Sequence, residues 1–333
     1  MSSAPTADEI ARDATWLVQA LDPSQGAARL VAMDRESYRA ASFLDDRMLE
    51  TPVDAQIVSW TSIEEAVSSD MRSDARWIFH IGHVGSTLVS RLLGELDGVL
   101  AIREPRLLRD LALTPADIRQ RYIALAPRLM SRTFAEAEVA CVKATSFTSD
   151  IAPELVPMTE RALFMFATPQ NYIGSILAGE NSIEELRLLA GSRAQRLNSR
   201  QIYLPSQNDA GLAAAAWACE MTALEQAAER MVDRQILWVN FDQMLGEMES
   251  ALAKLASFFA FDSRRAVEIA TGPLISRYSK ALEYEYGPNL RRELIAEAGE
   301  RFAGDIERAL AMLVSGAEKS PLLGRALARA KES

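Results

Sequence analysis

The stretch that decides the fold is HIGHVGSTLVSR, residues 80–91. The apolar run RWIFHI (76–81) leads into it and predicts a short buried strand, while Leu88, Leu92 and Leu96 recur at helical spacing behind it. Between strand and helix lies a turn rich in glycine and hydroxyl residues. This order is typical of anion-binding loops in α/β proteins, because the first amide groups of the helix point toward the ligand.

The alternation of short apolar runs with longer helical patterns continues along the chain. Four more apolar runs predict buried strands, at 99–102, 138–145, 161–167 and 235–240. Helical patterns cover 115–130, 182–200, 208–231 and the chain after about residue 284. Short buried strands that alternate with helices predict an α/β fold, with a P-loop-type open parallel sheet flanked by helices.

The two ends of the chain are expected to add helices to this sheet. Residues 1–75 have the pattern of polar-faced helices separated by turns, and we expect a helical N-terminal extension there. The α/β core is expected at 76–285, and C-terminal helices that pack on the core at 286–333.

The composition excludes several classes of partner. The chain has 333 residues and a formal net charge of −10, whereas nucleic acids and anionic membranes require a basic face. The start of the chain is polar and acidic, unlike a signal peptide, so a cytoplasmic protein is expected. Cys141 and Cys219 stand in apolar surroundings, as reduced core cysteines do. We expect a small-molecule partner and no nucleic acid or membrane, and leave a homo-oligomer open.

The turn itself is suited to hold a phosphate. Gly82 and Gly85 can adopt backbone angles closed to other residues and let main-chain N–H groups approach a ligand. Ser86 and Thr87 add hydroxyl donors at the start of the helix. The alternative is that the glycines only shape a tight turn while Ser86 caps the helix.

The loop also resembles that of a known family. The Walker A pattern G-x-x-x-x-G-K-[ST] is not matched, but HVGSTL (83–88) resembles the phosphosulfate loop of the sulfotransferases, [KR]-x-G-[ST]-[ST]-[LW]. The stretch RLLGELDGVLAIREP (91–105) is similar to the helix, turn and Glu-ending strand that follow that loop, and it puts Glu104 at the Glu position. The resemblance covers about residues 76–285.

This resemblance implies that the donor is 3′-phosphoadenylyl sulfate (PAPS), bound without a metal. The loop residues that would bind its 5′ side are Gly82, His83, Val84, Gly85, Ser86 and Thr87. The segment FATPQNYIGSILAG (166–179) resembles the one that binds the 3′-phosphate, with Ser175 matching and Ala167 where the family has Arg. ISRYSKALEY (275–284) resembles the late basic segment and offers Arg277 and Lys280 as substitutes.

Three residues are candidates for catalysis. Glu104 follows a strand directly and is expected to act as the general base, the alternative being an ion pair with Arg103 or Arg106. Lys143 ends another strand and either neutralises charge on the sulfate or is a solvated strand end. His83 stands where the family has Lys or Arg, and its charge is conditional because an unperturbed imidazole titrates near pH ~6.5.

Three other polar residues near these positions have structural explanations or remain open. His80 alternates with apolar residues and is expected to be a satisfied core histidine. Asp242 follows an apolar strand as a Walker B carboxylate would, but we expect it to cap the next helix. Arg91 faces either the ligand or solvent.

The sequence therefore predicts an enzyme that transfers a sulfuryl group from PAPS to a hydroxyl or amine of a small acceptor. A non-catalytic descendant that binds a nucleotide or a partner is the first alternative, since Ala167 and His83 depart from the family pattern. A small-molecule ATP kinase is the second, disfavoured by the missing P-loop lysine.

Overall fold

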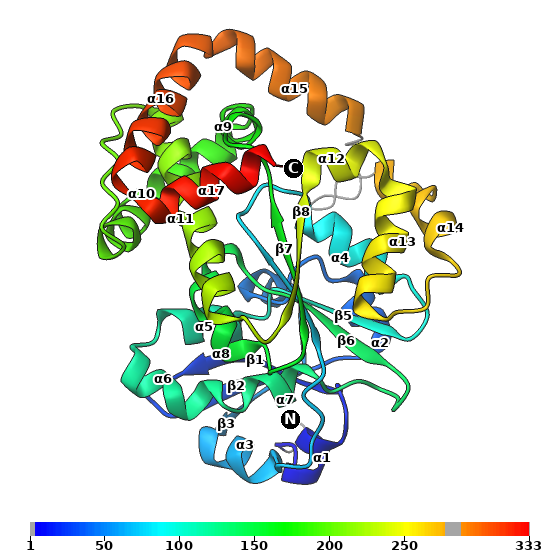
Figure 1. Ribbon diagram of the computed structural model, residues 1–333. Coiled ribbons are helices and arrows are strands. Elements are labelled where there is room, and N and C mark those ends of the chain that lie inside the picture. Colours follow the sequence, from blue (N-terminus) through cyan, green and yellow to red (C-terminus); the bar gives the residue numbers. More distant parts are fainter. Residues whose placement is uncertain (1–3, 277–287, 333) are drawn as a thin grey trace.

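The computed structural model of the protein describes residues 4–276 and 288–332. Its centre is a five-stranded parallel sheet with the strand order β5-β6-β4-β7-β8 (Figure 1). The strands are β4 (Arg76–His80), β5 (Val99–Arg103), β6 (Val139–Lys143), β7 (Arg161–Phe166) and β8 (Gln235–Asn240). All five lie where the apolar runs predicted them, and the predicted fold class is confirmed.

The order of the strands defines where a ligand can bind. The chain leaves the central strand β4, crosses to the edge strand β5, returns through β6, and then adds β7 and β8 on the other side. The connections therefore diverge at the carboxyl end of β4. In open parallel sheets, ligands bind beyond the carboxyl ends of the strands at such a point of reversal.

Helices cover both faces of the sheet. Helices α4 and α13 lie on one side, and α9 and α11 on the other (Figure 1). The helices around the sheet are α4 (Ser86–Gly94), α5 (Arg106–Leu113), α6 (Ala116–Ile123), α7 (Ala126–Met130), α8 (Ala152–Leu155), α9 (Pro169–Leu177), α10 (Glu180–Ser199), α11 (Asp209–Arg230), α12 (Phe241–Gly246), α13 (Met248–Phe259) and α14 (Ala266–Ala270). Short 3-10 turns, η2 (Ser146–Ile151) and η3 (Pro273–Ser276), complete this part.

Helix α11 is buried over most of its length because its sequence is alanine-rich on every side. Its Trp217 is fully buried, and the indole N–H donates to the carbonyl oxygen of Ala167 at 2.9 Å, just beyond β7. Small side chains thus allow close packing, while the single large aromatic ring fixes the helix to the carboxyl edge of the sheet.

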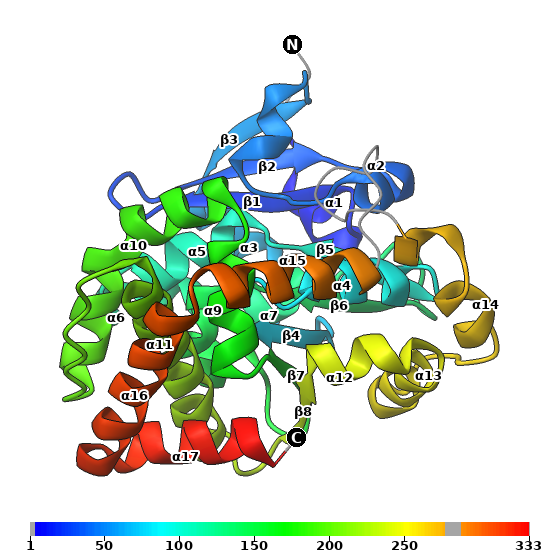
Figure 2. The same cartoon turned by 90° about the horizontal axis from the view of Figure 1, so that it is seen from above.

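The N-terminal region is not the helical extension that its pattern predicted. It contains a three-stranded antiparallel sheet, β1-β2-β3, that lies across one end of the molecule (Figure 2). Its elements are α1 (Ala7–Arg12), β1 (Trp16–Asp22), β2 (Ala27–Ala32), α2 (Arg35–Ala40), η1 (Asp46–Glu50), β3 (Ala55–Ser59) and α3 (Trp60–Ala66).

The error in this prediction comes from the turn at 22–26. The stretch LDPSQG (21–26), one of the turns expected between helices in this region, closes a β-hairpin between β1 and β2 instead. The Asp22 carboxylate accepts hydrogen bonds from the Ser24 and Gln25 amides, at 3.0 and 3.3 Å, and Gly26 has a φ of +57°. An Asx turn followed by a glycine with a left-handed backbone is typical of β-hairpins. This turn geometry outweighs the weak helical pattern on either side.

Arg132 fastens this N-terminal region to the core. Its guanidinium is buried and donates to the carbonyl oxygens of Leu129 (3.1 Å), Trp16 (2.8 Å) and Ile10. Burial lowers the pKa of Arg132. The guanidinium is therefore bonded to backbone carbonyls, and no described carboxylate forms an ion pair with it.

The C-terminal part consists of α15 (Pro288–Arg301), α16 (Ala303–Lys319) and α17 (Pro321–Lys331). These helices pack on α9 and α11. Helix α15 packs closely on α9 at Gly174, where an added Cβ would lie 3.1 Å from Ile295 of α15. Among the described residues, no helix combines the length and apolar composition that a membrane span requires.

Replacing Arg132 with Leu should lower the free energy of unfolding by about 3–5 kcal/mol, because three buried carbonyl groups lose their donor. Urea denaturation followed by circular dichroism measures this. Arg121→Leu is the control: Arg121 also links the two regions, through Glu64, but the pair is exposed and should contribute little. Equal effects of the two variants would mean that Arg132 does not fasten the N-terminal region.

Candidate active site

The loop between β4 and α4 has three left-handed residues within four positions. Gly82, His83 and Gly85 have φ values of +82°, +53° and +59°. Gly85 is the N-cap of α4, and no side chain in the described part of the chain caps this helix. The alternative, in which Ser86 caps this helix, is therefore wrong. The first amide groups of α4 and the hydroxyls of Ser86 and Thr87 are left for a ligand.

Glycine is required at position 85 for a second reason. A Cβ there would lie 1.8 Å from Cζ of Phe241, the first residue of α12. The Phe241 ring thus packs directly against the loop backbone. The neighbouring Val84 is fully buried, so only its backbone can serve a ligand.

His83 is half-buried and lies edge-on to Tyr172 of α9, with 6.1 Å between the ring centroids. The Tyr172 hydroxyl donates to the carbonyl oxygen of Ile81 at 3.3 Å. Burial raises the pKa of Tyr172 above its usual range, so it remains a neutral donor. Tyr172 therefore fixes both the entrance to the loop and the ring of His83.

The predicted catalytic residues Glu104 and Lys143 form a buried ion pair. Lys143 ends β6, in register with Arg103, and Glu104 directly follows Arg103 at the end of the neighbouring strand β5. Lys143 Nζ contacts Glu104 Oε1. Lys143 is only 1% exposed, so it is not a solvated strand end. Glu104 has a φ of +51°, a strained conformation for a non-glycine residue and one that recurs at functional sites.

The alternative partners suggested for Glu104 are occupied elsewhere. Arg103 donates to backbone carbonyls of residues 38–41, and Arg106 pairs with Asp46 and Asp110. The carboxylate of Glu104 is thus aligned by Lys143 rather than by an arginine next to it in the sequence.

His80 joins this ion pair to the loop. Its Nδ1 accepts the N–H of Gly82 at 3.0 Å, its Nε2 donates to the carbonyl oxygen of Ala144 at 2.9 Å, and Nε2 lies 3.8 Å from Glu104 Oε1. These roles fit a neutral imidazole that carries its proton on Nε2. His80 is the satisfied, buried histidine that the sequence predicted, and it uses the Gly82 N–H within the protein.

Sequence reasoning missed Arg47 and Phe43, which the N-terminal region places over the ion pair. Arg47 Nη2 lies 3.6 Å from Glu104 Oε2, and its guanidinium stacks 3.4 Å from the centroid of Phe43. Lys143 Nζ lies 5.6 Å from the same centroid. No sequence signal marks these residues, because their role depends on how a distant segment folds back.

The residues expected around the 3′-phosphate are only partly described. Ser175 lies on α9, and its hydroxyl donates to the carbonyl oxygen of Tyr172 at 3.0 Å. Ala167 is fully buried. Arg277 and Lys280 lie outside the described residues.

The prediction that Asp242 caps a helix is wrong. The cap of α12 is Asn240, whose side chain accepts the Asp242 N–H at 3.1 Å. The Asp242 carboxylate instead accepts from Arg291 of α15 at 3.2 Å and from Asn171 of α9 at 3.0 Å. It therefore joins three elements that are distant in the sequence.

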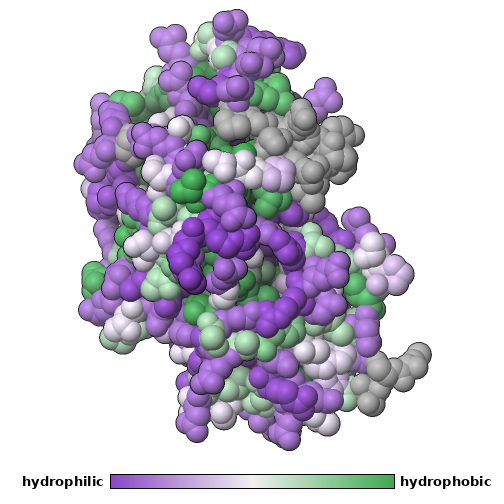
Figure 3. Space-filling view, turned by 90° about the vertical axis from the view of Figure 1, so that its right-hand side faces the viewer, coloured by the Kyte–Doolittle hydropathy of each residue, from purple (hydrophilic) through white to green (hydrophobic). Residues whose placement is uncertain are grey.

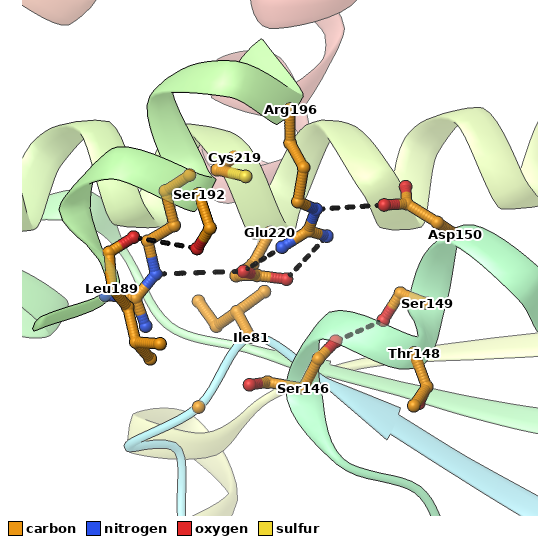
Figure 4. Close-up of polar contacts among 12 residues, drawn as sticks. Ile81, Ser146, Thr148, Ser149, Asp150, Leu189, Ser192, Arg196, Cys219 and Glu220 are labelled. Atoms are coloured by element: carbon orange, nitrogen blue, oxygen red, sulfur yellow. Dashed lines mark hydrogen bonds and ion pairs between the residues drawn. The ribbon is translucent and has the colours of Figure 1, made fainter. Parts of the chain in front are cut away.

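A buried ionic network adjoins the loop on the side of α11. Arg196 of α10 bonds to Glu220 of α11 at 2.6 Å and to Asp150 at 3.0 Å, above Ile81 (Figure 4). Arg193 lies 3.9 Å from Glu220, and its Nη1 is buried without a hydrogen-bond partner among the described residues. Arg193 and Glu220 are buried, while Arg196 and Asp150 are partly exposed, and the paired charges hold the loop's surroundings in one arrangement.

Comparison with known proteins returns a weak structural likeness. The sequence matches no protein-family model and no curated protein. The fold is similar to a sulfotransferase domain from the curacin biosynthetic pathway, with a TM-score of 0.40 and 12% identity over 74% of this chain and 99% of that domain. It is also similar to a sulfotransferase domain from the Synechococcus PCC 7002 olefin synthase, with a TM-score of 0.40 and 13% identity over 69% and 94%. At these values no residue role can be transferred.

Gly85→Ala should lower the free energy of unfolding by about 2–4 kcal/mol, through the clash with Phe241 and the left-handed backbone. The matched control is Gly191→Ala in α10, where a Cβ meets nothing within 4 Å and should stabilise the helix by about 0.5–1 kcal/mol. Urea denaturation measures both. A neutral Gly85→Ala would show that the loop and Phe241 are not held in contact.

Lys143→Met should destabilise the protein by about 3–5 kcal/mol, because Glu104 would remain buried without its main partner. Adding Glu104→Gln should recover a large part of this loss, as thermal or urea denaturation of the double variant would show. Lys254→Met on the exposed side of α13 serves as the control. If the losses of stability caused by the two substitutions simply added in the double variant, Lys143 and Glu104 would not form a direct pair.

Proposed function

We propose that this protein transfers a sulfuryl group from PAPS to a hydroxyl or amine of a small acceptor. The observation that carries the proposal is the Glu104–Lys143 pair. His80 connects this pair to a helix start, at the carboxyl edge of the sheet, that no described side chain caps. The proposed anion site and the buried ion pair lie at the same edge of the sheet. The resemblance of HVGSTL to the phosphosulfate loop supports this choice among group transfers.

The start of α4 would bind the 5′ phosphosulfate. Its first amide groups and the hydroxyls of Ser86 and Thr87 supply donors, and the helix dipole favours negative charge there. His83 would add a conditional positive charge beside the bridging oxygen. These groups are fixed before the donor arrives, which is the condition for electrostatic stabilisation of a transfer.

Glu104 would act as the general base. The acceptor oxygen forms its bond to sulfur while its proton passes to the Glu104 carboxylate. The bond from sulfur to the bridging oxygen breaks, and its electron pair leaves on adenosine 3′,5′-bisphosphate. Once protonated, Glu104 holds Lys143 less strongly, so the ammonium becomes available to the charge on the transferred group.

Recognition of the 3′-phosphate would depend on Ser175, Arg277 and Lys280, since Ala167 offers no charge. A bidentate arginine is the usual partner of a phosphate. Since Ala167 replaces it here, the affinity for the 3′-phosphate would come from the other three residues.

The first test measures binding. In the absence of metal, adenosine 3′,5′-bisphosphate at 100 times its Kd should stabilise the protein by about 2.7 kcal/mol, and AMP should stabilise it less. Differential scanning fluorimetry with these ligands and with Mg-ATP separates the candidates. Stabilisation by Mg-ATP alone would instead indicate a kinase, and bisphosphate binding without transfer to any acceptor would indicate the non-catalytic alternative.

The second test measures turnover once an acceptor is found. In the folded variant, Glu104→Gln should reduce turnover by about 10²–10⁴-fold with almost unchanged affinity for the bisphosphate, since the amide keeps the shape of the carboxylate but cannot take up the proton. The control is Glu160→Gln, a partly buried carboxylate paired with Arg76 at the opposite edge of the sheet. Normal turnover in Glu104→Gln would exclude Glu104 as the base.

A further inference from the structure

Apart from the loop before α4, the protein has a cavity that is surrounded by arginine side chains. The cavity has a volume of about 270 Å³ and lies at the free edge of β5, between α2, the end of α4 and the residue before α14. These elements lie on the right of Figure 1, and hydrophilic residues gather around a hollow on that face (Figure 3). The arginines that line it are Arg35, Arg39, Arg91, Arg103 and Arg265.

The three exposed arginines of this cavity are already neutralised. Each one pairs with a carboxylate that also lines the cavity. The pairs are Arg35 with Glu138, Arg39 with Glu95 (Nε to Oε1, 2.9 Å) and Arg265 with Asp97 (3.2 Å). These pairs account for all three lining carboxylates among the described residues.

The two buried arginines have no such partner. Arg103 is 2% exposed and donates only to the backbone carbonyls of Tyr38, Arg39 and Ala41, while its Nη1 makes no hydrogen bond to a described residue. Arg91 is 7% exposed and donates from Nη2 to Ser42 Oγ at 2.6 Å. Its Nε is buried and has no partner within the part of the chain described.

Two buried guanidinium groups therefore line this cavity, and neither forms an ion pair with a carboxylate of the described residues. Burial, and then the charge of Arg91, lower the pKa of Arg103 to about 10. Burial lowers the pKa of Arg91 as well, against the opposing effect of Glu95. Unpaired buried charges are costly, and a bound anion would remove this cost.

We propose that this cavity binds a small dianion of the phosphate or sulfate class, held by Arg91 and Arg103. Two guanidinium groups from different elements suit a tetrahedral oxyanion, because each can contact a separate pair of oxygens. A volume of about 270 Å³ accommodates such a group alone or at the end of a small molecule. The site is independent of the proposed sulfuryl transfer.

A ligand in this cavity would also affect the Glu104–Lys143 pair, because the two arginines contact a segment that leads to it. Arg103 directly precedes Glu104, and Arg91 and Arg103 together hold the segment 38–42. Phe43 follows this segment directly and Arg47 comes shortly after it, in η1, and these two residues cover Glu104 and Lys143. An anion between the two arginines would thus fix the segment from which Arg47 reaches Glu104.

Isothermal titration calorimetry with inorganic phosphate at low ionic strength tests the proposal, with chloride as the control for ionic strength. Titration of the full chain should show phosphate binding that persists in Ser86→Ala/Thr87→Val, because that variant alters only the loop. Arg91→Gln should weaken binding roughly tenfold or more. Glycerol 3-phosphate in place of phosphate distinguishes a free ion from a phosphorylated molecule, according to which binds more tightly.

A second variant keeps the test decisive if Arg91→Gln does not fold. Arg39→Glu reverses an exposed charge at the mouth of the cavity and should weaken phosphate several-fold, while Arg264→Glu, an exposed change outside the cavity, should not. Absence of phosphate binding, or binding lost in the loop variant and kept in Arg39→Glu, would overturn the proposal.

Discussion

The buried contact between Lys143 and Glu104 is the interaction on which the site depends. Two opposite charges at the ends of neighbouring strands are stable in a dry interior only while they remain together. Glu104 accordingly accepts a left-handed backbone conformation, and His80 links the pair to the Gly82 amide of the loop. The carboxyl edge of the sheet is thereby held as one unit rather than as separate strand ends.

The loop before α4 is fixed from the other side by packing. Phe241 covers Gly85 so closely that a single methyl group cannot be added, and Tyr172 supports Ile81 and the ring of His83. A loop held in this way keeps its amide groups oriented before any ligand binds. Preorganised donors of this kind are what a transfer without much protein rearrangement requires.

The N-terminal region contributes to the site rather than only extending the fold. Its strands are fastened by Arg132, and the segment after α2 brings Phe43 and Arg47 over the Glu104–Lys143 pair. The same segment is held from beneath by Arg91 and Arg103, which line the second cavity. One stretch of about ten residues thus lies between two charged sites.

By itself, the sequence determined the five buried strands and the loop. Apolar runs and a turn of glycine and hydroxyl residues are local patterns, and a parallel sheet buried on both faces requires such apolar strands. It also predicted that Glu104 and Lys143 lie at the carboxyl edge. Only the tertiary structure decided that they pair with each other, that Asp242 meets Arg291, and that residues 16–59 form a second sheet. Charge partners and hairpin pairing are set by which distant segments are brought together, and no local pattern records that choice.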